Sequence, residues 1–398
     1  MGCLLQINVT ANWGSTGKIA EDIGKLAIDA GWESWIAYGR GNPSSESKLI
    51  RIGNDWDMKS HALQSRLFDN HGLASSKVTK TFIRQIKEIK PDIIHLHNIH
   101  GYYLNYPLLF DFLKEYGAPV VWTLHDCWPF TGHCAYYDYA KCDKWRTQCH
   151  DCPQLRSYPA SVWLDRTERN FNRKKDAFLS HPDITFVPVS DWLKTELSKS
   201  FLSDYSAITI HNGINLDIFK PSQNITKQGN EKVILGVASV WDKRKGLDEF
   251  VKLRPLLPDN YLIILVGLSQ DQISSLPAGI TGIRRTENVG QLVDLYSMAD
   301  VFVNPTLEDN FPTTNLEALA CGTPVITYET GGSPEAIDDH TGFVVPYQDV
   351  TTLAEKIKIV CEKHPFDSIK CRERAVEFYD KQKVFKEYIN LYNQLLKQ

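Results

Sequence analysis

Short apolar segments alternate with amphipathic helical segments along almost the whole chain. Strands are expected in the first half at Leu4–Val9, Ser34–Tyr38, Asp92–His97, Val120–His125, Ile184–Val189 and Ile208–His211. The scheme restarts in the second half, with strands expected at Val233–Ala238, Tyr261–Val266, Val301–Asn304, Val325–Tyr328 and Phe343–Val345. Helical patterns such as Lys77–Ile89 and Pro107–Glu115 lie between the strands. Because parallel strands need a crossover connection, this alternation predicts an α/β fold built from doubly wound parallel sheets.

Two domains are expected, because 398 residues exceed what one hydrophobic core usually spans. Segment 213–231 is polar, rich in turn formers and without helical periodicity, so we expect it to be the interdomain linker. It separates an N-terminal Rossmann-like domain of residues 1–212 from a C-terminal one of residues 232–378. Residues 379–398 are expected to form a helix that returns to the N-terminal domain. Doubly wound sheets bind ligands outside the carboxyl ends of their strands, which predicts a site in a cleft between the domains.

Bulk composition excludes several classes of protein. A net charge of −4 argues against nucleic acid as a general partner. No apolar run reaches the roughly 20 residues of a membrane-spanning helix, and the N-terminus has no signal-type pattern. A cytoplasmic location is therefore expected.

Residues 11–27, ANWGSTGKIAEDIGKLA, superficially match a nucleotide-phosphate loop. That motif needs a glycine where Asn12 stands and a Ser or Thr where Ile19 stands, so the ATPase interpretation is poor. The order of strand, small-residue loop and helix still suits an anion at a helix N-terminus. We therefore expect Gly14 and Gly17 to belong to an anion-facing loop.

The segment PTLEDNFPTTNLEALACGTPVITYETGGSPE, residues 305–335, places one acid before a helix and a second acid within it. Asp309 ends the loop, Thr313 or Thr314 can cap the helix, and Glu317 lies in its first turns. Fixed acceptors beside a helix N-terminus suit a ligand that has both hydroxyls and negative charge. On spacing alone, a capped core helix whose acids complement its dipole is the favoured interpretation.

Asp309-x7-Glu317 and the following EALACGTPVI run resemble the E-x7-E signature of the family 4 retaining glycosyltransferases, which have the two-domain GT-B fold. The family usually has Glu at the first position, so which of Glu308 and Asp309 reaches the sugar stays open. The resemblance implies that Glu317 accepts hydrogen bonds from the ribose hydroxyls of a nucleotide-sugar. It also implies a binding surface for the donor sugar and diphosphate made of Asp309, Asn310, Phe311, Pro312, Thr313, Gly331 and Gly332.

Residues 238–250, ASVWDKRKGLDEF, resemble the diphosphate clamp of the same family. Lys245 matches the family lysine, and Arg244 replaces an arginine that the family places where Ser239 stands here. Cleavage of the glycosidic bond leaves a nucleoside diphosphate with growing negative charge, which fixed cations stabilise most in the transition state. A solvated charge run is the alternative, although cations are unfavourable at a helix start unless an anion joins them. By the same resemblance, Arg284 is expected near the base, and Gly14 and Gly17 are expected to face the donor diphosphate without a catalytic metal ion.

The first domain is expected to supply the acceptor side. By the resemblance, His125 at the end of a strand reaches the transferred sugar from the opposite wall of the cleft. His97, Asn98, His100 and Asp126 are expected to contact the acceptor. A zinc pair at His95 and His97 is conceivable from strand alternation, but no adjacent acid or cysteine supports it.

Five of the nine cysteines crowd into an insert at residues 127–163. In a cytosolic chain such density favours metal over disulfides, so we expect a structural zinc. Plain buried thiols that fill a loop-rich insert are an equally supported alternative. The expected ligands, which leave out Cys127 because it belongs to the active-site strand, are Cys134, Cys142, Cys149 and Cys152.

Residues 164–178, LDRTERNFNRKKDAF, combine basic residues with apolar residues at a spacing of seven. Such a helix could lie against anionic lipid at the inner membrane face, where a lipid-linked acceptor would be found. An ordinary helix packed through its phenylalanines is the alternative. The residues concerned are Leu164, Arg166, Arg169, Phe171, Arg173, Lys174 and Phe178.

The sequence thus predicts a glycosyltransferase that moves a sugar from a nucleotide-sugar to a hydroxyl of a glycan or lipid-linked glycan, with retention of configuration. It predicts no cofactor for catalysis. Two alternatives stay open: a sugar-nucleotide epimerase on the same fold, and a non-catalytic nucleotide-sugar-binding protein.

Overall fold

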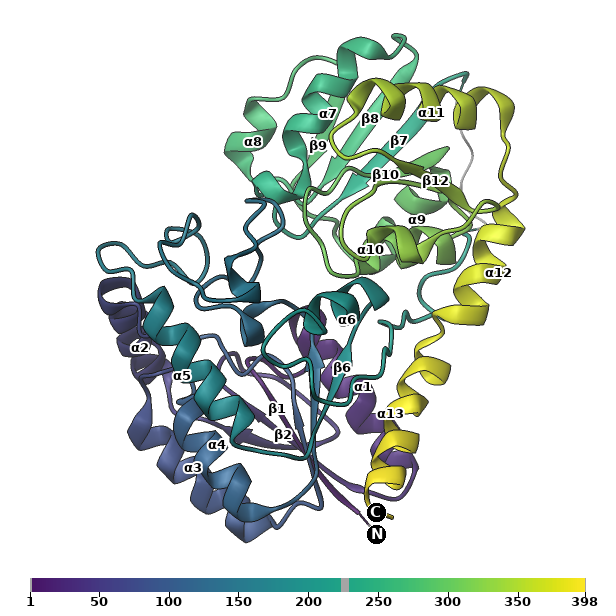
Figure 1. The fold of residues 1–398 in the computed structure, drawn as a ribbon. Coiled ribbons are helices and arrows are strands. Elements are labelled where there is room, and N and C mark those ends of the chain that lie inside the picture. Colours follow the sequence, from purple (N-terminus) through teal and green to yellow (C-terminus); the bar gives the residue numbers. More distant parts are fainter. Residues whose placement is uncertain (1, 223–228, 398) are drawn as a thin grey trace. The chain divides into compact units, whose positions relative to one another are not determined.

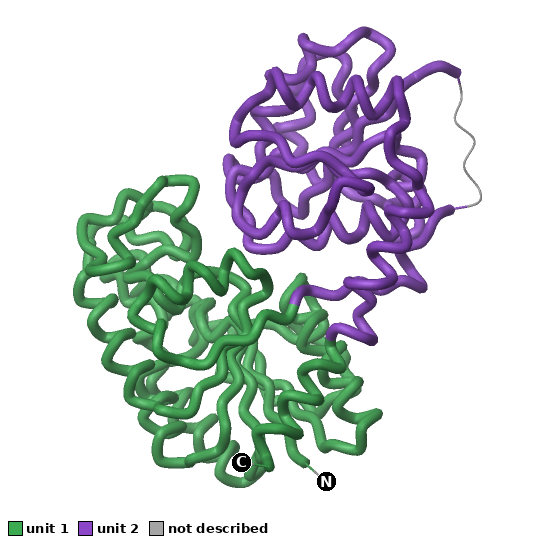
Figure 2. Tube along the Cα trace, turned by 45° about the vertical axis from the view of Figure 1, so that its right-hand side comes forward, with its two compact units in different colours: residues 1–210, 385–398 green, residues 211–384 purple. Residues whose placement is uncertain are grey.

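The computed structural model describes residues 2–222 and 229–397. The chain forms two compact units, which Figure 2 distinguishes by colour. Unit 1 comprises Met1–Ile210 together with Phe385–Gln398, and unit 2 comprises His211–Val384. Part of the expected linker, residues 223–228, lies outside the described residues.

Unit 1 is built on a parallel sheet of order β3-β2-β1-β4-β5-β6 (Figure 1). Strands β1 and β4 at its centre consist entirely of buried residues, as expected for a sheet covered on both faces. The strands are β1 (Cys3–Asn8), β2 (Glu33–Tyr38), β3 (Lys48–Arg51), β4 (Ile93–Leu96), β5 (Val120–Leu124) and β6 (Ile184–Pro188). The helices are α1 (Gly14–Asp29), α2 (Asp55–Phe68), α3 (Ser76–Ile89), α4 (Tyr106–Tyr116), α5 (Thr167–Leu179), α6 (Asp191–Leu197) and α13 (Lys381–Leu395).

Unit 2 repeats the arrangement with a parallel sheet of order β12-β11-β10-β7-β8-β9. The strands are β7 (Lys232–Val237), β8 (Tyr261–Val266), β9 (Ile280–Ile283), β10 (Val301–Asn304), β11 (Val325–Tyr328) and β12 (Gly342–Val345). The helices are α7 (Leu247–Leu253), α8 (Gln270–Ser274), α9 (Val289–Met298), α10 (Thr313–Ala320), α11 (Val350–Lys363) and α12 (Ser368–Phe378). The prediction of two doubly wound α/β domains is confirmed. No helix in the described part of the chain combines the length and the apolarity needed to cross a bilayer.

The strand predictions fail at the sheet edges. The expected strand at Ile208–His211 is wrong, since this region makes only an isolated bridge, between Phe186 and Ala207. Strands β3 and β9 were not predicted from the sequence, and both are edge strands in which most residues are partly exposed. An edge strand needs little apolar sequence because only one of its sides pairs with a neighbour.

Helix α13 is anchored to unit 1 by buried polar contacts as well as by packing. The Tyr392 hydroxyl bonds His95 Nδ1 at 2.6 Å, and His95 Nε2 bonds Thr123 Oγ1 at 2.7 Å. Thr123 Oγ1 donates in turn to the Tyr388 hydroxyl at 3.0 Å. Both tyrosines and His95 are fully buried, so each polar atom depends on this chain of bonds. The last helix therefore completes the core of the first unit.

Replacing Tyr392 with Phe should lower the free energy of unfolding of unit 1. The change leaves a buried acceptor on His95 without its donor, which costs about 1–3 kcal/mol. Urea unfolding is the measurement. Tyr139→Phe is the control, because Tyr139 is 39% exposed and its hydroxyl can bond water. Equal stability of the two variants would show that the bond to His95 contributes nothing.

Histidines are concentrated in the core of unit 1. Burial lowers the pKa of His61 and His125 to about 4, and it lowers the pKa of His71, His95 and His97 well below the ordinary value of 6.5. The unfolded chain therefore binds protons between about pH 6.5 and pH 4 that the folded unit does not bind. The stability of unit 1 is complete above that window and falls as the pH drops through it.

Unit 1 should therefore lose stability between pH 7.5 and pH 5 while unit 2 changes less. Hydrogen exchange followed by mass spectrometry at both pH values, corrected for the intrinsic exchange rate, reports each unit separately. Equal loss of protection in the two units would contradict the assignment to these histidines.

Candidate functional site

Each sheet reverses its strand order at one point, between β1 and β4 in unit 1 and between β7 and β10 in unit 2. In doubly wound sheets the crevice outside the carboxyl ends of the strands at this point binds ligands. The loops after β1, β4, β7 and β10 lie at these two points, and they carry many of the residues predicted for the site. Each unit is described by itself below.

In unit 2, the loops after β7 and β10 are bonded directly to each other. Leu307 N donates to the Arg244 carbonyl at 2.6 Å, and the Arg244 guanidinium donates to the Glu308 carbonyl at 3.0 Å. The Lys245 ammonium forms an ion pair with the Asp309 carboxylate. Three of the predicted residues, Arg244, Lys245 and Asp309, are thus brought together. Glu308 is 2% exposed, whereas the Asp309 side chain is 15% exposed and faces the lysine.

Helix α10 begins without a side-chain cap. Its N-cap residue is Pro312, which makes no capping hydrogen bond, so the expected cap by Thr313 or Thr314 is wrong. Proline fixes the backbone at the helix start but supplies no acceptor for the first N–H groups. Glu317, one turn into the helix, accepts a hydrogen bond from the Tyr296 hydroxyl at 2.7 Å.

The TGGSPE turn packs against the loop that carries Asp309. Gly332 N donates to the Asp309 carbonyl at 3.2 Å. Gly331 has φ +54°, and a Cβ built there would lie 1.8 Å from the same carbonyl oxygen. Glycine is therefore required at Gly331 for both its conformation and its close approach.

A buried polar network below these loops was not found from the sequence. Asn304 at the end of β10 donates to Asn315 at 2.8 Å, and Asn315 donates to the Ser333 hydroxyl at 3.0 Å. Ser333 and Thr327 share a further bond of 2.6 Å. The network ties β10, α10, β11 and the TGGSPE turn together. The sequence feature that could have indicated this network is a pair of asparagines, one at the end of a strand and one in the first turn of a helix.

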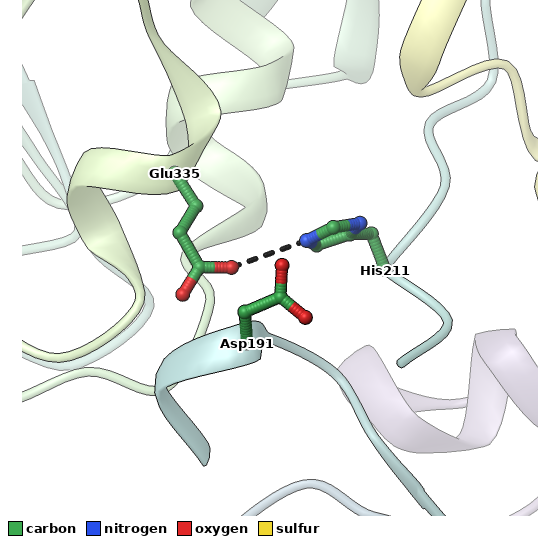
Figure 3. Close-up of side chains that lie close together, drawn as sticks. All are labelled: Asp191, His211 and Glu335. Carbon is green, nitrogen blue, oxygen red and sulfur yellow. Dashed lines mark hydrogen bonds and ion pairs between the residues drawn. The ribbon is translucent and has the colours of Figure 1, made fainter. Parts of the chain in front are cut away.

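The remaining predicted residues of unit 2 lie in the loops after β7, β9 and β10. Asn310 and Phe311 are buried in the loop after β10, and the Phe311 carbonyl accepts from Asn212 at 3.1 Å. His211 stacks near Phe311, with ring centroids 4.7 Å apart, and bonds Glu335 at 3.1 Å (Figure 3). Ser239 follows β7, whereas Arg284 is exposed at the end of the edge strand β9.

In unit 1, the loops after β1 and β4 meet at Asn8. Its side chain donates to the Thr10 carbonyl at 2.8 Å and accepts from Asn98 N at 3.2 Å. Gly14 adopts φ +68°, and a Cβ on Gly17 would lie 2.7 Å from the Thr10 hydroxyl. The small-residue loop therefore has its glycines where the backbone requires them. Helix α1 also begins without a side-chain cap.

His97 and His125 form a pair whose proton positions follow from their partners. Gln6 Nε2 donates to the Ala20 carbonyl at 2.8 Å, which leaves Gln6 Oε1 to accept from His97 Nε2 at 3.1 Å. His97 Nδ1 is then an acceptor, and His125 Nε2 donates to it across 3.1 Å. With a pKa of about 4, lowered chiefly by burial, His125 is neutral at pH 7. Both ring nitrogens of His97 are therefore already bonded inside the protein.

His100 and Asp126 form a second pair, with Nε2 and Oδ2 2.8 Å apart. Burial alone would raise the pKa of Asp126, but His100 and the N–H of Trp128 lower it overall. The other ring nitrogen of His100 bonds the Tyr158 hydroxyl at 3.0 Å. Tyr158 as a residue is 46% exposed, whereas burial of its hydroxyl raises the pKa of the phenol well above the ordinary value of 10. Tyr158 lies in the cysteine-rich insert and was not predicted as a site residue.

The four-cysteine zinc site is not supported. The four cysteines line one cavity, but among the described residues no group of three ligand atoms within 4.8 Å of one another includes a cysteine. The thiols have other partners: Cys134 is hydrogen-bonded to Cys152, and Cys149 Sγ accepts from Gly132 N at 3.2 Å. A tetrahedral site needs its four ligands on one ion, which this arrangement does not provide.

The predicted membrane helix is wrong as a lipid-facing surface. Phe171 and Phe178 of α5 are 1% and 0% exposed, and Phe178 packs against Phe110 with ring centroids 4.6 Å apart. Lys174, a supposed surface cation, is buried and donates to the Thr131 carbonyl at 2.8 Å. Phe171 and Phe178 mark the side of the helix that packs into unit 1, whereas Leu164 lies before the helix and is 38% exposed.

Each half of the chain matches the model of a protein family. Residues 20–218 match the model described as Glycosyltransferase Family 4. Residues 231–363 match the model described as Glycosyl transferases group 1. The chain belongs to glycosyltransferase family 4. The GT-B fold and the glycosyltransferase activity expected from the sequence are thereby confirmed, and the two alternative functions are not favoured.

Individual relatives agree with this membership. The chain is 24% identical to the putative colanic acid biosynthesis glycosyl transferase WcaC of Escherichia coli, over 98% of this chain and 100% of that protein. It is 26% identical, over 46% of this chain and 49% of the relative, to a Campylobacter jejuni N,N'-diacetylbacillosaminyl-diphospho-undecaprenol alpha-1,3-N-acetylgalactosaminyltransferase. The Anabaena protein Alr3699/HepE, solved with UDP and glucose, superposes with a TM-score of 0.68 at 13% identity, covering 99% of this chain and 100% of that one.

Replacing Gly331 with Ala should displace the loop that carries Asp309. The positive φ alone costs about 1–2 kcal/mol of stability. The overlap with the Asp309 carbonyl adds to this and moves the ion pair with Lys245. Gly229→Ala is the matched control, since Gly229 has φ +80° and no heavy atom of the described residues lies within 4 Å of a Cβ built there. Urea unfolding and nucleoside diphosphate binding are the measurements, and equal effects of the two variants would contradict the steric argument.

Proposed function

We propose that this glycosyltransferase moves a sugar from a nucleotide-sugar to a hydroxyl of a glycan or lipid-linked glycan, with retention at the anomeric carbon and without a catalytic metal. The observation that carries the proposal is the pairing of Lys245 and Arg244 with the Asp309 loop beside the uncapped start of α10. Cations and unsatisfied backbone N–H groups at one point suit a diphosphate.

Lys245 and Arg244 are assigned to the leaving group. When the glycosidic bond breaks, negative charge grows on the β-phosphate, and fixed cations stabilise that charge without reorganisation. In the protein without donor the Lys245 ammonium is held by Asp309. A bound diphosphate would share the Lys245 ammonium with the Asp309 carboxylate or displace that carboxylate from it. The same electrostatic role makes a divalent ion unnecessary for departure of the diphosphate.

The sugar and the ribose are assigned to α10 and the loop before it. Asp309 is favoured over Glu308 as the sugar-binding carboxylate, because Glu308 is 2% exposed whereas Asp309 meets the lysine. The backbone of Asn310, Phe311 and Pro312 would hold the sugar beside Asp309. Glu317 would accept from the ribose hydroxyls, and Gly332 N–H, already bonded to the Asp309 carbonyl, keeps that loop in place.

On the acceptor side, Asp126, His100 and Tyr158 are assigned to hydroxyl recognition, since they form a hydrogen-bond chain that ends in a partly exposed tyrosine. His97 is assigned to orienting His125, because both of its ring nitrogens are engaged. A neutral His125 would face the transferred sugar through its carbonyl, which can stabilise positive charge on the ring. A lipid-linked acceptor is supported by the name of the Campylobacter relative.

Retention would follow from a front-face route. The acceptor hydroxyl attacks on the side from which the diphosphate leaves, and a phosphate oxygen takes the hydroxyl proton. The anomeric carbon exchanges one oxygen partner for another on the same face, so no covalent sugar–enzyme intermediate is needed.

The activity is tested by incubating the protein with UDP-, GDP-, ADP- and TDP-sugars, with and without glycan and polyprenyl-diphosphate-linked acceptors. Transfer predicts acceptor-dependent release of the nucleoside diphosphate, and NMR of the product should show the donor's anomeric configuration. Excess EDTA should leave the rate unchanged. Epimerised donor without transfer, or an inverted product, would refute the proposal.

Lys245→Ala should lower kcat far more than it weakens donor binding. One well-placed electrostatic donor contributes about 2.7–4 kcal/mol to barrier lowering, equivalent to roughly 100- to 1000-fold in kcat. Lys243→Ala is the control. Lys243 is an exposed cation in the same short 3-10 helix, Lys243–Lys245. Steady-state kinetics distinguish the two, and a wild-type kcat for Lys245→Ala would remove the lysine from the mechanism.

A further inference from the structure

The carboxylate of Glu317 is held by a tyrosine from the neighbouring helix. Tyr296 on α9 donates its hydroxyl to Glu317 Oε2 at 2.7 Å, and α9 and α10 contact each other directly (Figure 1). Tyr296 is 0% exposed, whereas Glu317 is partly exposed. The bond therefore links a rigid interior group to a carboxylate that reaches the surface of unit 2. It uses one of about four acceptor positions of that carboxylate.

Tyr296 has little freedom to move. Its ring packs against Phe302 and Phe219, with centroids 5.4 and 6.4 Å away. Its carbonyl accepts from the Thr323 hydroxyl at 2.6 Å, which fixes the end of α9 to the segment after α10. Burial and the adjacent Glu317 charge raise the pKa of Tyr296 well above its ordinary value. The phenol therefore stays protonated and serves as a donor to the carboxylate.

We propose that Tyr296 is a positioning residue that makes the donor site selective for ribonucleotides. It holds Glu317 in the orientation in which the carboxylate accepts from the 2′- and 3′-hydroxyls of the ribose. This inference rests on the proposed function, specifically on the assignment of Glu317 to the ribose. It extends the assignment to a residue that never contacts the ligand.

The reason for selectivity is geometric. A carboxylate that accepts from two vicinal hydroxyls must keep both oxygens in the correct plane. A glutamate side chain that becomes fixed in this orientation loses the conformational entropy of its other rotamers. The bond to Tyr296 removes that freedom before the ligand arrives, so less entropy is lost on binding. A 2′-deoxyribose cannot make one of the two bonds and therefore gains little from this orientation.

The test is the ratio of affinities for matched ribo- and deoxyribonucleoside diphosphates, measured by calorimetry. The probes are UDP, GDP and ADP with their 2′-deoxy forms, and the base bound most tightly by the wild-type protein is used. The wild type should prefer the ribose form by about tenfold or more. Tyr296→Phe should lose most of this preference through weaker binding of the ribose form, with the deoxy form unchanged within about twofold.

Two further variants separate positioning from general damage. Tyr328→Phe is the matched control, because Tyr328 is also fully buried in unit 2 and donates to a carboxylate, Glu249 Oε2, at 2.7 Å. It should keep the ribose preference. Glu317→Asp withdraws the carboxylate from Tyr296 while the tyrosine stays in place, and it should lose the preference even if Tyr296→Phe folds poorly.

Four results would overturn the proposal or the site assignment on which it rests. An unchanged ribose preference in Tyr296→Phe, or equal weakening of both forms, would refute the role of Tyr296. An unchanged preference in Glu317→Asp would refute it as well. Absence of binding by every nucleoside diphosphate to the wild-type protein would instead refute the proposed donor site.

Discussion

The direct bonding between the loops after β7 and β10 is the constraint on which the candidate site depends. Parallel strands place their carboxyl ends at one edge of the sheet, and the reversal of strand order leaves two loops without a strand between them. Here the Arg244 carbonyl and guanidinium, the Leu307 N–H and the Lys245–Asp309 pair close that gap. The cations are consequently fixed in place before any ligand arrives, as electrostatic catalysis requires.

Below these loops, buried polar groups replace the usual apolar packing. The Asn304–Asn315–Ser333 network and the Tyr296–Glu317 bond connect the helix start and the turn to the sheet. Unit 1 uses the same principle in the Gln6–His97–His125 chain. A fully bonded network of this kind is rigid, because breaking one bond leaves a buried polar group unpaired. Both units therefore hold partly exposed candidate site residues, His125 and Glu317, by hydrogen bonds to the interior.

The sequence predicted the elements that bury long apolar runs. Strands β1, β5, β8 and β10 are fully or almost fully buried, and their apolar stretches identified them. It did not predict β3 or β9, where edge positions tolerate Lys48 and Gly282. Periodicity also marked the phenylalanines of α5 without indicating what covers them. Lys174 shows the reason, since a cation in a helical pattern gives no sign that carbonyls in the interior accept its hydrogen bonds.

By itself the sequence determined the fold class, the family and the residue types of the candidate donor site, because these depend on local patterns: alternation of strands and helices, Asp309-x7-Glu317 and the Arg244-Lys245 pair. Tertiary structure decided which predicted residues share a position and which are already engaged. His97 is bonded on both sides. The cysteines line one cavity, but among the described residues none belongs to a group of three ligand atoms within 4.8 Å of one another. Tyr158 and Tyr296 bond candidate site residues that lie elsewhere in the chain. Hydrogen-bond partners are set by distances between segments remote in sequence, and spacing along the chain carries no record of them.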